Sequence, residues 1–244
     1  MNIHIFKNKK SLDEAVSRLL IEQVNKQPKS VLGLATGSTP LGIYKQLMDD
    51  HKRHKTSYQD VVTINLDEYV GLDKNSPASY QSFMKVNLFD ALDINPKNTF
   101  IPDGETNDLD AACQAYDEIM KKHPIDIQLL GIGSNGHIGF NEPNTPFDSE
   151  THIIELALKT RTDNAVHFKS LDDVPTQAIT MGIKSITNAK RILLVATGAH
   201  KAQAVKGMIF GEVDPLLPAS VLQTHPNVDV FLDYQAASLI LSSK

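Results

Sequence analysis

The side chains best suited to chemistry in this sequence lie in the segment Gly131–Pro143, which is Gly-Ile-Gly-Ser-Asn-Gly-His-Ile-Gly-Phe-Asn-Glu-Pro. The segment follows the apolar run Ile125–Ile132, which predicts a buried strand. Its glycines and its proline are typical of a loop. The imidazole of His137 and the carboxyl group of Glu142 can transfer protons, and the amide of Asn135 can position a small polar substrate. Because ligands bind beyond the carboxyl ends of strands in open α/β sheets, we expect a site here.

A dinucleotide-binding loop is the first alternative, because Gly131, Gly133 and Gly136 match the pattern G-x-G-x-x-G after a strand. That fingerprint requires a helix that opens at the third glycine and holds the pyrophosphate at its N-terminus. Gly139 and Pro143 would break such a helix early, which argues against a nicotinamide cofactor. A turn with a structural histidine is the plainer alternative, but the nearby carboxyl group and amide favour a site.

A second loop with polar side chains follows the predicted strand Val31–Ala35 and opens a helix. Gly37 lets the backbone approach a ligand closely, and the hydroxyl groups of Thr36, Ser38 and Thr39 can donate hydrogen bonds. The free N–H groups and the partial positive charge of a helix start favour a phosphate. An ordinary N-cap with spare hydroxyl groups is the alternative, and the pattern is not a Walker A loop.

Adjacent carboxyl groups, Asp67 and Glu68, follow the predicted strand Val61–Leu66. Burial or mutual repulsion can raise the pKa of one of them toward neutrality, where it serves proton transfer. Strand residues alternate between faces, so both can point inward only if the strand has ended. A turn acid beside a solvated neighbour is the alternative.

Two cations complete the set of candidate ligands. Lys201 follows the predicted strand Arg191–Thr197 and falls in the first turn of the next helix, where a cation opposes the helix dipole. A bound anion would remove that conflict. Arg161 lies in a polar turn, where a surface arginine would be the ordinary interpretation.

Strand-like and helix-like segments alternate from end to end, which predicts an α/β fold. Near-continuous apolar strands predict a three-layer, Rossmann-like, mostly parallel sheet with helices on both faces. No linker or internal repeat divides the chain, so we expect a single domain over residues 1–244. Further strands are predicted at Ile3–Phe6, Ala178–Met181 and Val228–Leu232, and helices at 11–24, 39–54, 79–91, 109–122 and 199–210. In such a sheet the four loops meet at one edge.

The composition excludes several classes of protein. The 244 residues carry a net charge of −5, which argues against nucleic-acid or acidic-membrane partners. Cys113 is the only cysteine and is interpreted as a structural thiol, so a disulfide and a cysteine metal site are excluded. No HExxH motif calls for a metal. No membrane span or signal peptide is indicated, and we expect a cytoplasmic protein.

With these loops together, the chain resembles the glucosamine-6-phosphate deaminases of the glucosamine/galactosamine-6-phosphate isomerase family. The resemblance runs nearly end to end and rests on five segments: Leu34–Pro40, Asn65–Leu72, Ser79–Met84, Gly131–Pro143 and Gly198–Lys201. 6-Phosphogluconolactonase and ribose-5-phosphate isomerase share the general architecture, but they are not expected to carry both the second and the fourth of these segments.

The resemblance implies a hydrolase of amino-sugar catabolism that converts D-glucosamine 6-phosphate and water to D-fructose 6-phosphate and ammonia without metal or organic cofactor. It implies that Asp67 moves a proton between C2 and C1 and that His137 opens the sugar ring. Glu142 and Asn135 would orient the imidazole. The phosphate would be bound by the loop 36–39 together with Arg161 and Lys201.

Two departures from the family pattern affect what we expect. Many members have aspartate where this chain has Asn135, which can accept a hydrogen bond from the imidazole but cannot balance its charge. The C-terminus is shorter than in the allosteric, hexameric members, so we expect a monomer or a small homo-oligomer and no allosteric site. The alternatives are a 6-phosphogluconolactonase-like hydrolase and a non-catalytic sugar-phosphate sensor. A sensor would normally carry a DNA-binding segment, for which there is no room before Ile3.

Overall fold

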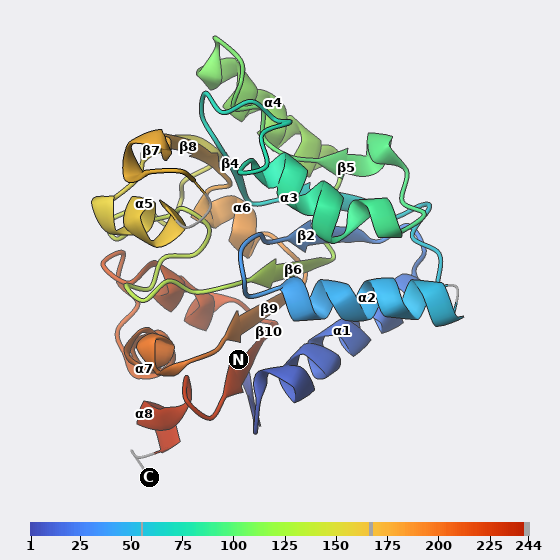
Figure 1. Cartoon of the computed structure of the whole chain (residues 1–244). Coiled ribbons are helices and arrows are strands. Elements are labelled where there is room, and N and C mark those ends of the chain that lie inside the picture. Colours follow the sequence, from blue (N-terminus) through green and yellow to red (C-terminus); the bar gives the residue numbers. More distant parts are fainter. Residues whose placement is uncertain (55, 166–167, 242–244) are drawn as a thin grey trace.

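The largest element of the fold is a seven-stranded sheet in which every pair of neighbouring strands is parallel. The computed structural model describes residues 1–54, 56–165 and 168–241. In spatial order the strands are β1 (Asn2–Phe6), β10 (Val228–Asp233), β9 (Ile192–Ala196), β6 (Ile127–Leu130), β2 (Val31–Leu34), β3 (Val62–Asn65) and β5 (Thr99–Phe100). The carboxyl ends of β2, β6 and β9 all point to the same side of the molecule (Figure 1).

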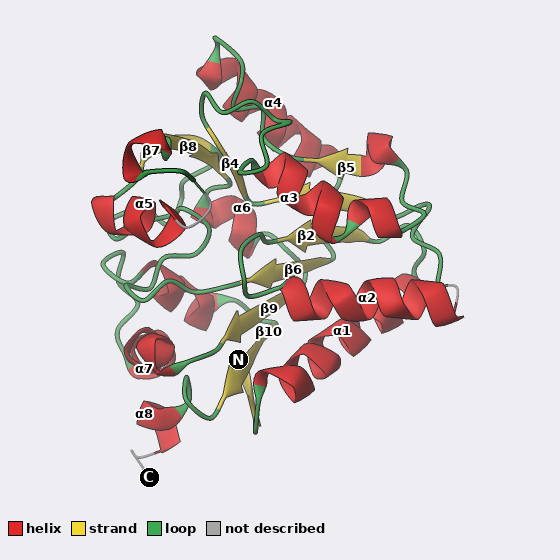
Figure 2. Cartoon of the chain, viewed as in Figure 1, coloured by secondary structure: helices red, strands yellow, loops and turns green. Residues whose placement is uncertain are grey.

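Helices cover both faces of this sheet, because its central strands are apolar on both faces. In β9, Leu193 and Val195 pack into one hydrophobic cluster, while Ile192, Leu194 and Ala196 pack into the other. The first cluster is completed by α1 (Lys9–Lys26), α2 (Leu41–His54) and α3 (Tyr80–Asn87). The second is completed by α4 (Leu109–Lys122), α6 (Ile183–Thr187), α7 (Ala202–Phe210), the 3-10 segment Pro218–Thr224 and α8 (Ser238–Leu241). The predicted three-layer α/β fold is thus confirmed (Figure 2).

A small antiparallel sheet stands apart from the main one. Its order is β4 (Asp67–Tyr69), β8 (Gln177–Thr180) and β7 (His152–Glu155). The sequence predicts a strand near β8 but does not indicate its sheet, and β7 is not predicted. Only Leu66 separates β4 from β3, and its carbonyl accepts a hydrogen bond from Met181 N at 2.7 Å. The chain therefore changes sheets at the residue before Asp67.

The first helix starts earlier than predicted, because a residue that precedes the predicted helix forms its N-cap. Asn8 caps α1, because its side chain accepts a hydrogen bond from Ser11 N at 3.0 Å. Ser11, at which the predicted helix 11–24 begins, therefore lies inside the helix. Ser79, the first residue of the helix predicted over 79–91, is the N-cap of α3, which ends at Asn87, and α4 has the predicted bounds.

The remaining elements are short. They are α5 (Leu158–Asn164) and 3-10 turns at Phe89–Ala91, Pro96–Asn98, Leu171–Asp173 and Ala199–Lys201. Cys113 is buried in α4, and burial raises the pKa of its thiol to about 11, as a structural role predicts. Within the described part of the chain, no helix has both the length and the apolar character needed to span a bilayer.

Candidate active site

A cavity of about 670 Å³ lies where the loops after β2, β3, β6 and β9 meet. These four strands are neighbours in the sheet, so their carboxyl ends deliver the four loops to one place. Most of the predicted site residues line the cavity: Thr36, Gly37, Ser38, Thr39, Asp67, Asn135, His137 and Lys201. In Figure 2 the chain after β2 turns back into α2, whereas the chain after β9 leads to α7.

The loop 36–39 forms part of the cavity wall, and a ligand can approach its backbone closely. Gly37 has a φ of 83°, and a Cβ atom there would meet open space, so glycine is required by the backbone conformation alone. Tyr44 Oη donates to the carbonyl of Ala35 at 2.5 Å, and Lys9 Nζ donates to the carbonyl of Thr39 at 2.9 Å. Side chains from α2 and α1 thus hold the two ends of the loop. Within the described residues, the hydroxyl groups of Thr36 and Ser38 have no protein partner and remain available to a ligand.

Asp67 lines the same cavity in an environment that disfavours its charge. It is 6% exposed, and no described residue donates a hydrogen bond to its carboxyl group. Burial, and in second place the charge of Glu68, raise the pKa of Asp67 to about 8. A carboxyl group with such a pKa can accept and return a proton near neutral pH.

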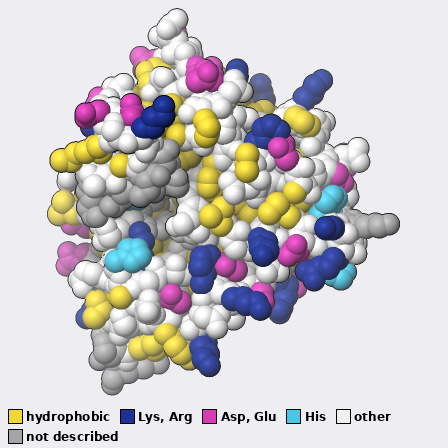
Figure 3. All heavy atoms as spheres, viewed as in Figure 1, with side chains coloured by type: hydrophobic (Ala, Val, Ile, Leu, Met, Phe, Trp, Pro, Cys, Tyr) yellow, Lys and Arg dark blue, Asp and Glu magenta, His cyan; other side chains and the backbone are white. Residues whose placement is uncertain are grey.

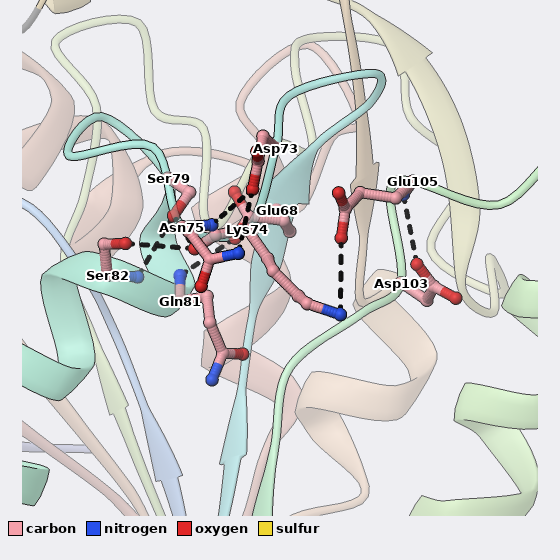
Figure 4. A network of polar contacts seen from close by, with 9 residues as sticks. All are labelled: Glu68, Asp73, Lys74, Asn75, Ser79, Gln81, Ser82, Asp103 and Glu105. Atoms are coloured by element: carbon pink, nitrogen blue, oxygen red, sulfur yellow. Dashed lines mark hydrogen bonds and ion pairs between the residues drawn. The ribbon is translucent and has the colours of Figure 1, made fainter.

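Glu68 points away from Asp67, as the alternation of strand side chains predicts. Its carboxyl group accepts hydrogen bonds from the backbone N–H groups of Tyr69 (2.9 Å), Tyr80 (3.0 Å) and Gln81 (2.9 Å). Burial nevertheless raises its pKa. Figure 4 shows this carboxyl group beside the first turn of α3, near Lys74 and its ion pair with Glu105 (3.8 Å). Glu68 therefore holds the start of α3 and contributes its charge to the environment of Asp67.

The imidazole of His137 is placed by the glycines of its loop. A Cβ atom on Gly133 would lie 2.4 Å from the ring, so only glycine leaves the imidazole its position. His137 Nδ1 is buried and lies 3.6 Å from Glu142 Oε2, slightly beyond a hydrogen bond. Burial alone would raise the pKa of Glu142, but His137, Thr160 and Asn135 together hold it at about 2. Glu142 is therefore ionised and faces the imidazole at all ordinary pH values.

Asn135 contacts Glu142 instead of the ring. Its Nδ2 donates to Glu142 Oε2 at 2.7 Å, and its Oδ1 accepts from the backbone N–H of His137 at 3.2 Å. The sequence interpretation had the amide accept a hydrogen bond from the imidazole, which this arrangement does not provide. An asparagine can donate to the carboxylate, whereas an aspartate here would repel it. The amide thus suits its position next to an ionised Glu142.

The two predicted phosphate cations differ in position. Lys201 lines the cavity at the N-cap of α7, together with His200. The structure does not bring Arg161 to the cavity: its Nη2 donates to the carbonyls of Leu171 (3.0 Å) and Val174 (2.9 Å). Its Nε is buried and has no partner among the described residues. Arg161 would have to exchange these contacts to reach a phosphate.

Sequence reasoning missed several residues of the cavity: Tyr80, Phe140, Thr160, Asn164 and His200. Phe140, Tyr69 and Tyr80 pack together, with ring centroids 4.9–6.0 Å apart, and form an aromatic wall near Asp67. Thr160 and Asn164 come from α5, which has too short an apolar pattern to be predicted. His200 adjoins Lys201 and could have been found from that alone.

The arrangement can bind a phosphate, transfer a proton at carbon and transfer another at oxygen. The loop 36–39 and Lys201 carry groups suited to the first, Asp67 to the second, and the pair His137–Glu142 to the third. Among the described residues, no group of three or more His, Cys, Asp or Glu side chains could hold a metal ion.

Known proteins resemble this chain over nearly its whole length. The family model for glucosamine-6-phosphate isomerases/6-phosphogluconolactonase matches residues 7–231. A glucosamine-6-phosphate deaminase of Geobacillus sp. (strain WCH70) is 49% identical over 97% of this chain and 95% of its own length. The corresponding deaminase of Halalkalibacterium halodurans is 48% identical over 93% of each chain.

Solved structures give the same result. A monomeric glucosamine-6-phosphate deaminase superposes with a TM-score of 0.96 at 44% identity, over 98% of this chain and 100% of its own. The 6-phosphogluconolactonase of Leishmania guyanensis has a TM-score of 0.77 at 20% identity, over 97% of both chains, and shares the fold. The chain therefore belongs to the glucosamine-6-phosphate isomerase/6-phosphogluconolactonase family.

Proposed function

We propose that this protein is a glucosamine-6-phosphate deaminase, which converts D-glucosamine 6-phosphate and water to D-fructose 6-phosphate and ammonia. The observation that carries the proposal is the presence in one cavity of a carboxyl group with a pKa near 8 and a histidine backed by an ionised carboxylate. An aldose–ketose rearrangement needs these two groups, one for carbon and one for oxygen. The near-full-length identity to deaminases supports the same activity.

Ring opening is the role of His137. The imidazole accepts the proton of the C1 hydroxyl group and returns a proton to the ring oxygen, while the bond between C1 and the ring oxygen breaks and C1 becomes an aldehyde. Glu142, ionised and 3.6 Å from Nδ1, stabilises the imidazolium that forms in between. Asn135 keeps Glu142 in this orientation through its Nδ2.

Isomerisation is the role of Asp67. Its carboxylate removes the proton from C2, while O1 takes up a proton that the ammonium group releases, so that an enolamine forms. Asp67 then returns its proton to C1, which leaves a hydroxyl group at C1 and a protonated imine at C2. Water then adds to this carbon and ammonia leaves. At pH 7 Asp67 is largely protonated, because its pKa is about 8. The cationic amino group of the substrate would favour the carboxylate that is needed for the reaction.

The phosphate cradle consists of the loop 36–39 and Lys201. The hydroxyl groups of Thr36, Ser38 and Thr39 and the backbone at Gly37 supply donors, and Lys201 supplies charge. Arg161 stays a predicted additional ligand, supported by the unpartnered Nε of its guanidinium group.

The experiment is the release of ammonia from glucosamine 6-phosphate by the purified protein, with and without a chelator. We expect release in both samples, coupled to fructose 6-phosphate. Hydrolysis of 6-phosphogluconolactone without ammonia release would favour a lactonase. Thermal stabilisation by the sugar phosphate without any product would favour a sensor.

Three further predictions stand beside this proposal. The full chain, residues 1–244, forms one domain. The protein is a monomer or a small homo-oligomer, which the monomeric structural relative supports and sedimentation can test. A cytoplasmic location remains a prediction from the sequence.

A further inference from the structure

Two hydrogen bonds from different segments fix the carboxylate of Glu142, and only one of them comes from its own loop. Asn135 Nδ2, in the same loop, donates to Oε2 at 2.7 Å. Thr160 Oγ1, in α5, donates to Oε1 at 2.5 Å across 18 residues of sequence. Each oxygen of the carboxylate thus has one donor of its own.

We propose that Thr160 is a positioning residue for the proton relay, which it serves by fixing the carboxylate plane of Glu142 so that Oε2 faces His137 Nδ1. The inference rests on the proposed deaminase function and extends it to a residue outside the family motifs quoted above. The terminal torsion of a glutamate is broad, so one donor leaves the carboxylate free to rotate. A second donor on the other oxygen removes that freedom.

The geometry around His137 makes this orientation important. Nδ1 is buried, and no described residue hydrogen bonds to it. Glu142 Oε2 lies 3.6 Å away, just beyond hydrogen-bond distance. A small rotation of the carboxylate in one direction gives Nδ1 a charged hydrogen-bond acceptor. A rotation in the other direction removes Glu142, which is the only ionised side chain within 4 Å of Nδ1 among the described residues.

The placement of Thr160 is that of a site residue. Its side chain is buried and borders the same cavity as His137 and Asp67. Asn164, one helical turn later, borders the cavity too. Thr162, on another face of α5, is exposed, and its hydroxyl group donates to the carbonyl of Leu158 in its own helix. The face of α5 that carries Thr160 is therefore directed at the reacting groups.

The test compares Thr160→Val, Thr160→Ser and the control Thr162→Val, which makes the same change on the outer face of the helix. In Thr160→Val we expect kcat for ammonia release to fall about tenfold to a hundredfold, because a hydrogen bond to a charged group is lost. KM should change less than about threefold, since the phosphate contacts remain. Thr160→Ser should restore most of the activity, and Thr162→Val should match the wild type.

A second measurement separates positioning from general damage to the cavity. Exchange of the C1 hydrogen of fructose 6-phosphate with solvent depends on Asp67 and can start from the open-chain ketose already in solution. In Thr160→Val this exchange should fall much less than ammonia release. Equal losses in both assays would overturn the proposal, as would wild-type activity in Thr160→Val.

An NMR titration tests the same contact without substrate. The pKa of Glu142 should rise from about 2 toward its ordinary value in Thr160→Val and should return in Thr160→Ser. An unchanged pKa would overturn the inference. If Thr160→Val does not fold, Thr160→Ala gives the same comparison. Failure of the wild-type protein to release ammonia would instead overturn the proposed function, while the titration would still decide the contact between Thr160 and Glu142.

Discussion

Replacement of Asp67 by asparagine should abolish turnover and stabilise the fold at the same time. The folded protein holds the carboxyl group of Asp67 at a pKa of about 8, against an ordinary value of 3.8. Between these two pH values the folded state keeps a proton that the unfolded chain releases. Stability therefore decreases as pH rises, by about 1.4 kcal/mol per pH unit. At pH 7 the accumulated cost is about 4 kcal/mol.

Asparagine has nearly the same shape and does not incur this cost, since it has no proton to release. Its amide must still find partners in a site where no described residue donates to Asp67, which costs about 1–3 kcal/mol. We expect a net gain of about 1–3 kcal/mol at pH 7. A catalytic group that is costly to bury is the usual form of the trade-off between stability and activity.

The assay is urea unfolding of wild-type and Asp67→Asn protein at several pH values between 5 and 8. The difference in the free energy of unfolding should grow with pH by up to about 1.4 kcal/mol per unit. Asp229→Asn is the control of opposite sign: Asp229 accepts hydrogen bonds from Asn2, His4 and Arg191, its pKa is lowered, and its loss should destabilise. A difference for Asp67→Asn that does not change with pH would refute the reasoning, and so would residual turnover near the wild-type rate.

Three other substitutions test the remaining parts of the site. Gly133→Ala should lower kcat at least about tenfold with little change in KM, because the new Cβ would lie 2.4 Å from the His137 ring and displace it. Steady-state kinetics test this, and an unchanged kcat would contradict the role proposed for the ring. Lys201→Ala should raise KM about tenfold to a hundredfold by the loss of a charge-assisted phosphate contact. The control Lys206→Ala, further along α7, should leave KM unchanged. Equal KM values for the two variants would mean that the phosphate binds elsewhere. Glu68→Gln should lower the free energy of unfolding by about 1–3 kcal/mol in urea, because the amide keeps one accepting oxygen and its NH2 group must face at least one of the three backbone N–H groups. A neutral effect would show that the lost bond is dispensable.

On the face shown in Figure 3, positively and negatively charged side chains are mixed. Lysine and arginine side chains are interspersed with acidic ones on the face shown in Figure 3, which agrees with the modest net charge of −5. We therefore expect an anionic substrate to be bound by local groups, and Lys201 and the loop 36–39 are the candidates that line the cavity.

The sequence determined six of the seven strands of the main sheet, the longer helices on its faces and the four loops at its edge, whereas the two-residue strand β5 was not predicted. These features follow from local patterns: apolar runs predict the buried strands, and the spacing of apolar residues predicts the longer helices. Parallel strands end at one edge, so the loops with Asp67, His137 and Lys201 could be assigned to one site before any coordinates. The resemblance to deaminases supplied the roles of these side chains.

Only the tertiary structure decided how the charged groups are paired. The contacts of Glu142 with Asn135 and Thr160 span 7 and 18 residues, and the latter crosses between segments whose relative position no local pattern encodes. The raised pKa of Asp67 is likewise a result of burial in the assembled cavity and of a short strand that turns Glu68 away. Residue types and loop positions are properties of the local chain, whereas pKa values and the orientation of a carboxylate depend on distances that exist only after the segments have packed together.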